Sequence, residues 1–319
     1  IRTDISLAGI PTDLEQLSSL ADMAKKGIQY VVVDAFTAQP FKGNPAAVCF
    51  LEDDAAAPAG DGRWMQSVAV EFNLSQTAFF SRDSSCAADA ATPRFHLRWF
   101  TRVTEVALCG HATLATAHFL FTSVLAERHG VVEFVTKSGV LTAKKVPAPE
   151  AEKQGKLFIE LDFPMSDYVR CDPAGELPSI PETLNGAPVV SVHKSVTTND
   201  FIVELSSGKE VADVLPNIEE IRKCAGRGVI VTAPAPAGSG YDFFTRFFCP
   251  KFGIDEDPVC GSAHCVLAPY WGGKLGKQKL IAFQVSPRSG TLYLELDVVN
   301  RRVRIQGEAV TVMAGTLFA

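Results

Sequence analysis

The sequence lacks any apolar run long enough to cross a lipid bilayer. Its apolar stretches have the length of single strands, as at residues 30–33 and 229–231, whereas a membrane-spanning helix needs about 20 apolar residues in succession. The sequence also lacks a run of lysine and arginine that could follow a phosphate backbone, and its net charge is −6. We therefore expect a soluble protein whose partners include neither a membrane nor a nucleic acid.

The eight cysteines lack the tight spacing of a disulfide framework, and the sequence shows no secretory signal. Reduced thiols and a cytoplasmic location are therefore expected. A metal site could be assembled by ligand count from Cys109, His111, Cys260, His264 and Cys265. Their spacings match no zinc pattern, so we predict no metal site.

A duplication is the most informative feature of the chain. Cys109-Gly110-His111-Ala112 and Cys260-Gly261-Ser262-Ala263 are near copies, and each follows a strand-like aromatic segment. A Ser-Gly pair, at Ser138 and at Ser289, follows each cysteine by 29 residues. The spacing indicates one α+β unit present twice, with a pseudo-twofold axis that brings the two Cys-Gly units face to face.

The length of the chain fits two such units of about 150 residues each. The expected segments are a first half at 23–164, a crossover at 165–188 and a second half at 189–319, whose last strand is free to cross back. Residues 1–22 are interpreted as a leader or an added segment, although they would also suit a docked helix. Residues 113–121 are apolar almost all round, so each half should be a sheet wrapped around one buried helix.

The Cys-Gly units lie where a strand should lead into a helix. The free N–H groups of a helix start favour anions, so a thiolate at Cys109 or Cys260 and a substrate carboxylate would both be stabilised there. The alternative is that each cysteine is a small buried residue at a tight turn. The preserved spacing of the copies favours a functional pair that faces a cleft between the halves.

Two acidic positions are candidates for proton transfer. Glu71 should lie in the last turn of a helix beside Val70 and Phe72, where the helix dipole and partial burial would both raise its pKa. A solvated surface glutamate is the alternative. Asp257 belongs to an acidic segment just before Cys260, which reads either as a charged loop or as part of the same site.

Four ordered motifs carry a resemblance to a known family: DAFT at 34–37 with FKGNPAAV at 41–48, EFNLSQTAF at 71–79, CGHATLA at 109–115 and EDPVCGSAH at 256–264. From about Tyr30 to the C-terminus the chain resembles the phenazine-biosynthesis isomerase (PhzF-like) family. The resemblance implies the diaminopimelate-epimerase fold, with two similar α+β halves and the site between them. It also implies an isomerase without a metal or an organic cofactor.

The resemblance further implies residue roles. The glutamate that matches Glu71 shuttles a proton between substrate carbons in the best-known member, which acts on a dihydro-hydroxyanthranilate. Asp257 is the second implied catalytic carboxylate. The positions expected to contact a small carboxylate-bearing substrate are Asn44, Gly110, His111, Gly261 and Ser262. A homodimer is left open.

The chain departs from the usual family pattern at its paired thiols. Cys109 and Cys260 occupy the places of the two catalytic cysteines in diaminopimelate epimerase and proline racemase, so two-thiol epimerisation is an alternative. A non-catalytic binding protein is a further alternative, against which the presence of Glu71 and Asp257 argues. We favour the carboxylate mechanism.

Overall fold

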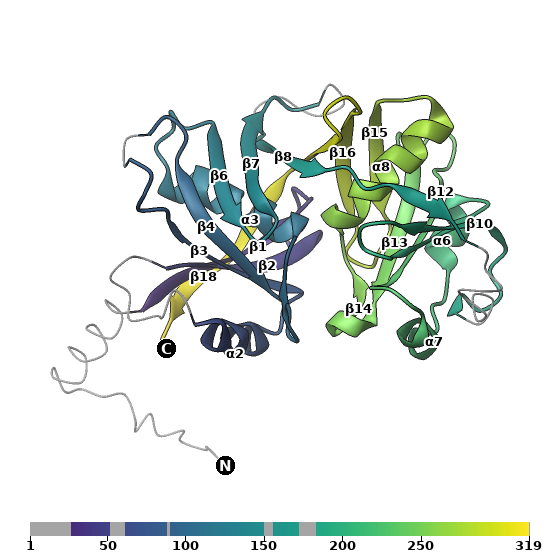
Figure 1. The fold of residues 1–319 in the computed structure, drawn as a ribbon, viewed down its shortest axis with the longest axis horizontal. Coiled ribbons are helices and arrows are strands. Elements are labelled where there is room, and N and C mark those ends of the chain that lie inside the picture. The colour runs from purple at the N-terminus through teal and green to yellow at the C-terminus, as the bar shows by residue number, and fades with distance from the viewer. Residues whose placement is uncertain (1–26, 52–60, 88–89, 150–155, 172–182, 319) are drawn as a thin grey trace, which may run out of the picture.

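The computed structural model describes residues 27–51, 61–87, 90–149, 156–171 and 183–318. The segment 1–22 and part of the expected crossover lie outside these ranges. Figure 1 shows two lobes side by side, the first built mainly from the N-terminal half of the chain and the second from the C-terminal half. Within the described residues, no helix is both long enough and apolar enough to pass through a membrane.

The first lobe is a curved sheet around a central helix (Figure 1). Its elements are β1 (Ile28–Ala35), β2 (Asn44–Phe50), α2 (Gly62–Phe72), β3 (Gln76–Arg82), β4 (Arg94–Phe100), β5 (Glu105–Val106), α3 (Gly110–Phe119), the π-helical turn η1 (Leu120–Val124), β6 (Val131–Thr136), β7 (Gly139–Val146) and β8 (Phe158–Pro164). Helix α3 carries small and apolar side chains on all its faces, and Gly110 to Ala117 are all buried. The expected buried helix is confirmed.

The second lobe repeats this plan around helix α8. Its elements are β9 (Tyr168–Arg170), β10 (Val189–Ser195), β11 (Phe201–Leu205), α6 (Gly208–Asp213), α7 (Ile218–Lys223), β12 (Val229–Pro234), β13 (Phe243–Cys249), the 3-10 turn η2 (Pro250–Phe252), β14 (Ile254–Asp257), α8 (Gly261–Leu275), β15 (Lys279–Gln284), β16 (Gly290–Asp297) and β17 (Arg302–Gly307). Strand β18 (Ala309–Leu317) follows.

The strand connections show the duplication directly. β2 and β3 are parallel neighbours, as are β11 and β12. β4 pairs in parallel with β6 across the crossover through α3, and β13 pairs in parallel with β15 across the crossover through α8. The duplicated α+β fold predicted from the sequence is confirmed, because each lobe uses the same order of strands and crossover helices.

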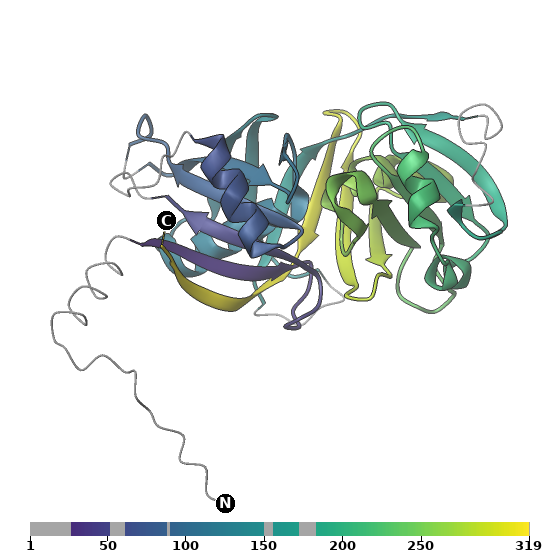
Figure 2. The ribbon, with the colours of Figure 1, turned by 90° about the horizontal axis from the view of Figure 1, so that it is seen from below.

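The two lobes share one continuous hydrogen-bonded network. β8 of the first lobe pairs antiparallel with β17 of the second. The strands that follow this junction exchange between the lobes. β9 follows β8 in the chain and pairs with β10 of the second lobe, and β18 follows β17 and pairs with β1 of the first lobe. Figure 2 shows β18 running beside β1. The junction strands fix the relative position of α3 and α8.

The starts of α3 and α8 touch backbone to backbone. Cys109 and Cys260 are the N-cap residues, both with extended backbone, and Gly110 and Gly261 are the first helical residues. A Cβ atom added to Gly110 would lie 2.8 Å from the Cα atom of Gly261, and one added to Gly261 would lie 3.0 Å from the Cα atom of Gly110. Glycine is therefore required at both positions, because a side chain would force the helix starts apart.

Candidate active site

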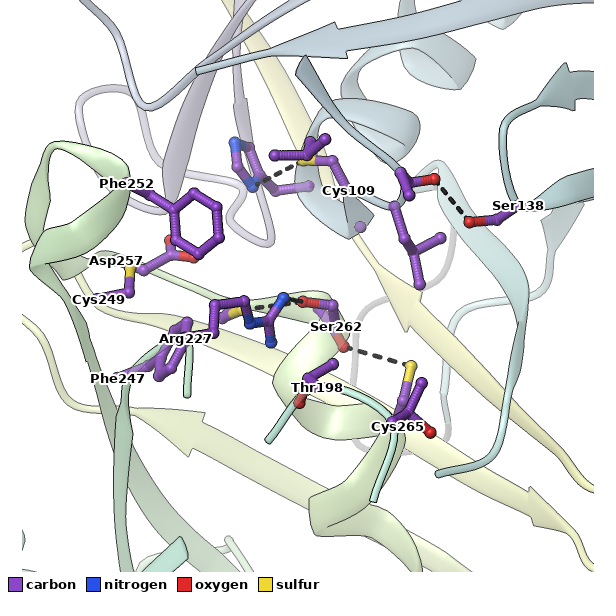
Figure 3. A pocket seen from close by; sticks show the side chains of 18 of the residues that line it. Cys109, Ser138, Thr198, Arg227, Phe247, Cys249, Phe252, Asp257, Ser262 and Cys265 are labelled. Atoms are coloured by element: carbon purple, nitrogen blue, oxygen red, sulfur yellow. Dashed lines mark hydrogen bonds between the residues drawn. The ribbon is translucent and has the colours of Figure 1, made fainter. Parts of the chain in front are cut away.

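A cavity of ≈ 490 Å³ opens between the lobes at the paired helix starts. Its lining includes Cys109 to His111 from the first Cys-Gly unit and Cys260 to Ser262 from the second, together with Asp257. Figure 3 shows Cys109 on one side of the cavity and Ser262 and Asp257 on the other. The structure thus brings the two Cys-Gly units to one pocket, whose volume is in the range for small-molecule sites.

Asn44 contacts polar residues on both sides of this pocket. It follows Gly43. Glycine is required at position 43 because φ is +62° and an added Cβ atom would lie only 2.2 Å from the Ala35 carbonyl oxygen. Its buried amide Nδ2 lies 2.5 Å from Asp257 Oδ1 and 3.1 Å from His111 Nδ1. Asn44 is not among the residues that line the cavity, and its contacts in the structure position Asp257 and His111. Its contact with substrate stays a prediction.

His111 is held in a neutral state. Burial lowers the pKa of His111 to about 3. Its ring nitrogens lie 3.5 Å from Cys109 Sγ and 3.3 Å from Ser75 Oγ. A neutral imidazole at this place can exchange hydrogen bonds with a hydroxyl or amine of a substrate, but it supplies no positive charge.

Asp257 combines burial with a pKa near neutrality. Burial raises the pKa of Asp257 to about 6, and the Cys260 thiol, the Arg227 charge and the Asn44 amide oppose this rise. The side chain is 8% exposed and lines the cavity. A carboxyl group with such a pKa is mostly ionised at neutral pH but is easily protonated, so it can both take up and return a proton.

The two thiols are neutral at neutral pH. Burial raises the pKa of Cys109 and of Cys260 far above the ordinary value of a thiol, and in both cases it outweighs the hydrogen bonds that favour the thiolate. Cys260 Sγ lies 3.4 Å from Ser262 Oγ. The expectation that the helix starts stabilise a thiolate is therefore wrong, because loss of hydration is the larger effect.

Glu71 does not reach the cavity. It is an exposed residue in the last turn of α2 and is not among the lining residues. The buried side of α2, which includes Met65 and Val68, packs with Phe79 on one face of the first sheet, whereas Phe80 packs in the cluster around α3 on the other face. The expectation that Glu71 borders the cleft is not met, because α2 covers the outer face of the sheet that holds α3.

Several polar residues that line the cavity were not predicted from the sequence, and Gln76 and Arg227 are two of them. Gln76 begins β3, is 8% exposed and has a buried Oε1 atom without a hydrogen-bond partner among the described residues. It lies five residues after Glu71 in the same motif. Arg227 comes from the segment before β12 and forms an ion pair with Asp200. No spacing rule singled out either residue.

One wall of the cavity is apolar, and the described residues contain no cluster of potential metal ligands. Among the described residues, no group of three or more His, Cys, Asp and Glu side chains is arranged to hold a metal ion. The cavity wall on the side of β13 and β14 is apolar, with Phe247, Phe252 and Ile254. The site thus offers an acid/base carboxyl group, hydrogen-bonding groups and an apolar surface.

Comparisons with known proteins agree with this architecture. Residues 33–315 match the family of phenazine biosynthesis-like proteins, PhzC-PhzF. An uncharacterised isomerase of Halalkalibacterium halodurans is 41% identical over 286 residues, which cover 90% of this chain and 97% of that protein. A phenazine biosynthesis protein of the PhzF family from Enterococcus faecalis has a crystal structure that matches with a TM-score of 0.75 and 36% identity, covering 92% of this chain and 100% of that one.

A more distant structure shares the fold. A hydroxyproline epimerase from Agrobacterium vitis, solved with bound trans-4-hydroxy-L-proline, matches with a TM-score of 0.54 and 11% identity over 92% of this chain and 93% of that one. At this identity the likeness concerns the architecture alone. The predicted epimerase-like fold is thereby confirmed.

Proposed function

Since this chain belongs to the family of phenazine biosynthesis-like proteins and is an isomerase, we propose that it moves a proton between carbon atoms of a small carboxylate-bearing substrate. The proton carrier in this proposal is Asp257, which takes the place that sequence reasoning gave to Glu71. The observation that carries the proposal is a buried carboxyl group with a pKa of about 6 in the cavity between the two helix starts.

Asp257 suits this task better than the other carboxyl group of the cavity wall. Glu105 also lines the cavity, but it accepts hydrogen bonds from Arg98 and Lys137, and the Arg98 bond is the main reason why its pKa is lowered. A carboxylate held in this way is a weak base. Asp257 lacks such a cation in direct contact among the described residues and remains available for proton transfer.

The helix starts supply the electrostatic part of the mechanism. Removing a proton from the carbon beside a carboxylate places additional negative charge on the carboxylate oxygens. The backbone N–H groups at the starts of α3 and α8 lie at the cavity around Gly110 and Gly261 and favour such a charge. Neutral His111 and Ser262 would hold polar substituents of the substrate.

The apolar wall narrows the proposed substrate class. Phe247, Phe252 and Ile254 would pack well against a flat ring. A cyclohexadiene carboxylic acid, similar to a dihydro-hydroxyanthranilate, fits both this wall and the acid/base group. We place this substrate class first among those to be tested.

Two-thiol epimerisation is the second candidate. Cys109 and Cys260 share the cavity at equivalent positions of the duplicated fold, which is the arrangement that proton exchange from opposite faces requires. Against it stands the burial of both thiols, which keeps them protonated. We therefore rank it below the carboxylate mechanism.

A solvent-exchange screen tests the proposal. The protein is incubated in D₂O with cyclohexadiene carboxylic acids and with amino acids, and deuterium incorporation is followed by NMR. On any substrate that exchanges, Asp257→Asn should lose about 10²- to 10⁴-fold of the rate, the usual contribution of a general acid/base. Glu71→Gln, which neutralises an exposed carboxylate outside the cavity, should retain the rate. A fully active Asp257→Asn variant would refute the assignment.

A further inference from the structure

Arg227 brings a guanidinium group to the cavity wall. Its side chain is 21% exposed, and its Cζ atom lies 5.3 Å from the centre of the Phe247 ring. Figure 3 shows it extending between Phe247 and Ser262. The side chain therefore lies between the apolar wall and the start of α8.

A buried carboxylate fixes this guanidinium in place. Asp200 is fully buried and accepts hydrogen bonds from Arg227 Nε at 2.9 and 3.1 Å and from Arg227 Nη2. Thr198 Oγ1 donates a further hydrogen bond to Asp200 Oδ2 at 2.7 Å. Because two nitrogens of Arg227 share one carboxylate, the orientation of the group is set before any ligand binds.

Two of the N–H groups of Arg227 remain available to a ligand. A guanidinium has five N–H groups. Asp200 takes the Nε–H and one N–H of Nη2, and Ser262 Oγ accepts one N–H of Nη1 at 3.3 Å. No hydrogen bond among the described residues uses the other two, one on each terminal nitrogen. Two such donors match the two oxygens of a carboxylate.

The surroundings determine what the rest of the ligand should be. Asp257 lies beside Phe252 on the same side of the cavity as Phe247 (Figure 3). A ligand whose carboxylate binds Arg227 would therefore place its body against aromatic side chains and near the acid/base group. Asp200 already balances the charge of Arg227. Long-range attraction between Arg227 and an anionic ligand is therefore weak, and the ligand is selected by hydrogen bonds to the directed N–H groups.

We propose that Arg227, oriented by Asp200, binds the substrate carboxylate together with the N–H groups at the start of α8, which lies beside it. The ring of the substrate then lies against Phe247 and Phe252. The part that concerns the substrate rests on the proposed isomerase function. The carboxylate site itself does not, because it is defined by binding.

Equilibrium binding of benzoate tests this proposal. Benzoate is a flat ring with one carboxylate, and benzamide has the same shape without the charge. By isothermal titration calorimetry, Arg227→Gln should weaken benzoate binding by about 10- to 100-fold, as expected for loss of charge-assisted hydrogen bonds. Its effect on benzamide should be small. Arg227→Lys keeps the charge but not the paired donors and should recover only part of the affinity.

Two companion variants make the result interpretable. Arg227→Gln leaves Asp200 buried without its cation, so the double variant Asp200→Asn/Arg227→Gln removes both charges and should show the same loss with a stable fold. Arg301→Gln breaks an exposed ion pair with Asp167 and should leave benzoate binding unchanged. Thermal unfolding of each variant verifies the fold.

Several outcomes would overturn the inference. Benzoate that fails to bind the wild-type protein, or binds the folded double variant as tightly as wild type, would show that Arg227 is not the carboxylate site. Equal losses for benzoate and benzamide would also refute it, because they would indicate a packing effect. If Asp257→Asn remains active but benzoate binding still depends on Arg227, the proposed mechanism fails and the carboxylate site stands.

Discussion

Replacing Asp257 by asparagine should make the protein more stable while it removes the activity. Burial raises the pKa of Asp257 from its ordinary value of 3.8 to about 6, so the folded protein binds this proton more tightly than the unfolded chain does. The stability that the group contributes is present below about pH 4 and is lost as the pH rises through about 6. At neutral pH the folded state therefore bears the cost of a buried charge.

The size of this cost follows from the shift. At 1.36 kcal/mol per pKa unit, the rise from 3.8 to about 6 corresponds to about 3 kcal/mol at pH 7.5. Asparagine has nearly the same shape, never ionises and can still accept the hydrogen bond from Asn44. Asp257→Asn should therefore raise the free energy of unfolding by up to about 3 kcal/mol at pH 7.5 and by about half as much at pH 5.

Urea unfolding followed by tryptophan fluorescence measures this difference at each pH. Glu71→Gln is the matched control, since it neutralises one exposed carboxylate, and it should change the free energy of unfolding by less than about 0.5 kcal/mol. An Asp257→Asn variant that is no more stable than wild type at pH 7.5, or whose advantage grows toward acid pH, would refute the reasoning. A gain in stability with loss of activity is the pattern expected of a catalytic group held in an unfavourable environment.

Two further pairs of substitutions test the geometry of the helix starts. Gly110→Ala and Gly261→Ala should each destabilise the protein by about 1–3 kcal/mol in urea unfolding, because the new methyl group meets the opposite backbone. Gly130→Ala is the control. No atom of the described residues lies within 4 Å of its added Cβ, so it should be nearly neutral in the same assay. Cys109→Ser and Cys260→Ser should keep most of the activity, since both thiols are protonated; loss of turnover in both, beside an active Asp257→Asn, would establish the two-thiol mechanism instead.

The architecture was accessible from the sequence because it leaves periodic and repeated signals. The matched Cys-Gly units and their equal distances to Ser138 and Ser289 report a duplication, which the strand order of both lobes shows. The segment at 113–121 has no polar face, and burial of α3 is the way such a helix is stabilised. The same signals placed the site between the halves.

The details of the site depended on tertiary structure that no local pattern contains. The position of Glu71 near a helix end was correctly predicted, but the sequence does not state which face of the sheet α2 covers. The pKa of Cys260 depends on how completely the cavity excludes water, and burial there outweighs the helix start. Arg227 becomes a candidate only when the fold places Asp200, 27 residues away in the chain, against it.

The duplication is incomplete at one position, and this asymmetry argues for a single proton carrier. In β14, Asp257 pairs with Phe247, and in the equivalent strand β5 the residue that pairs with Trp99 is Val106. Both positions precede their Cys-Gly cysteine by three residues. At this position a carboxyl group lines the cavity from one half and a valine from the other. Two-base epimerisation would therefore have to use the Cys109 and Cys260 thiols, both of which burial keeps protonated.

A single carrier predicts the fate of a label. If Asp257 both removes and returns the proton, the transfer stays on one face of the substrate, and some of the deuterium from a substrate labelled at the donor carbon should reach the acceptor carbon in H₂O before it exchanges with solvent. Mass spectrometry of the product during early turnover measures this fraction. Two thiols on opposite faces cannot pass one label from donor to acceptor, because the proton removed and the proton delivered belong to different groups. Label at the acceptor carbon would therefore exclude the two-thiol mechanism. Product free of label at all pH values, under conditions where the remaining substrate keeps its own, would count against the Asp257 shuttle.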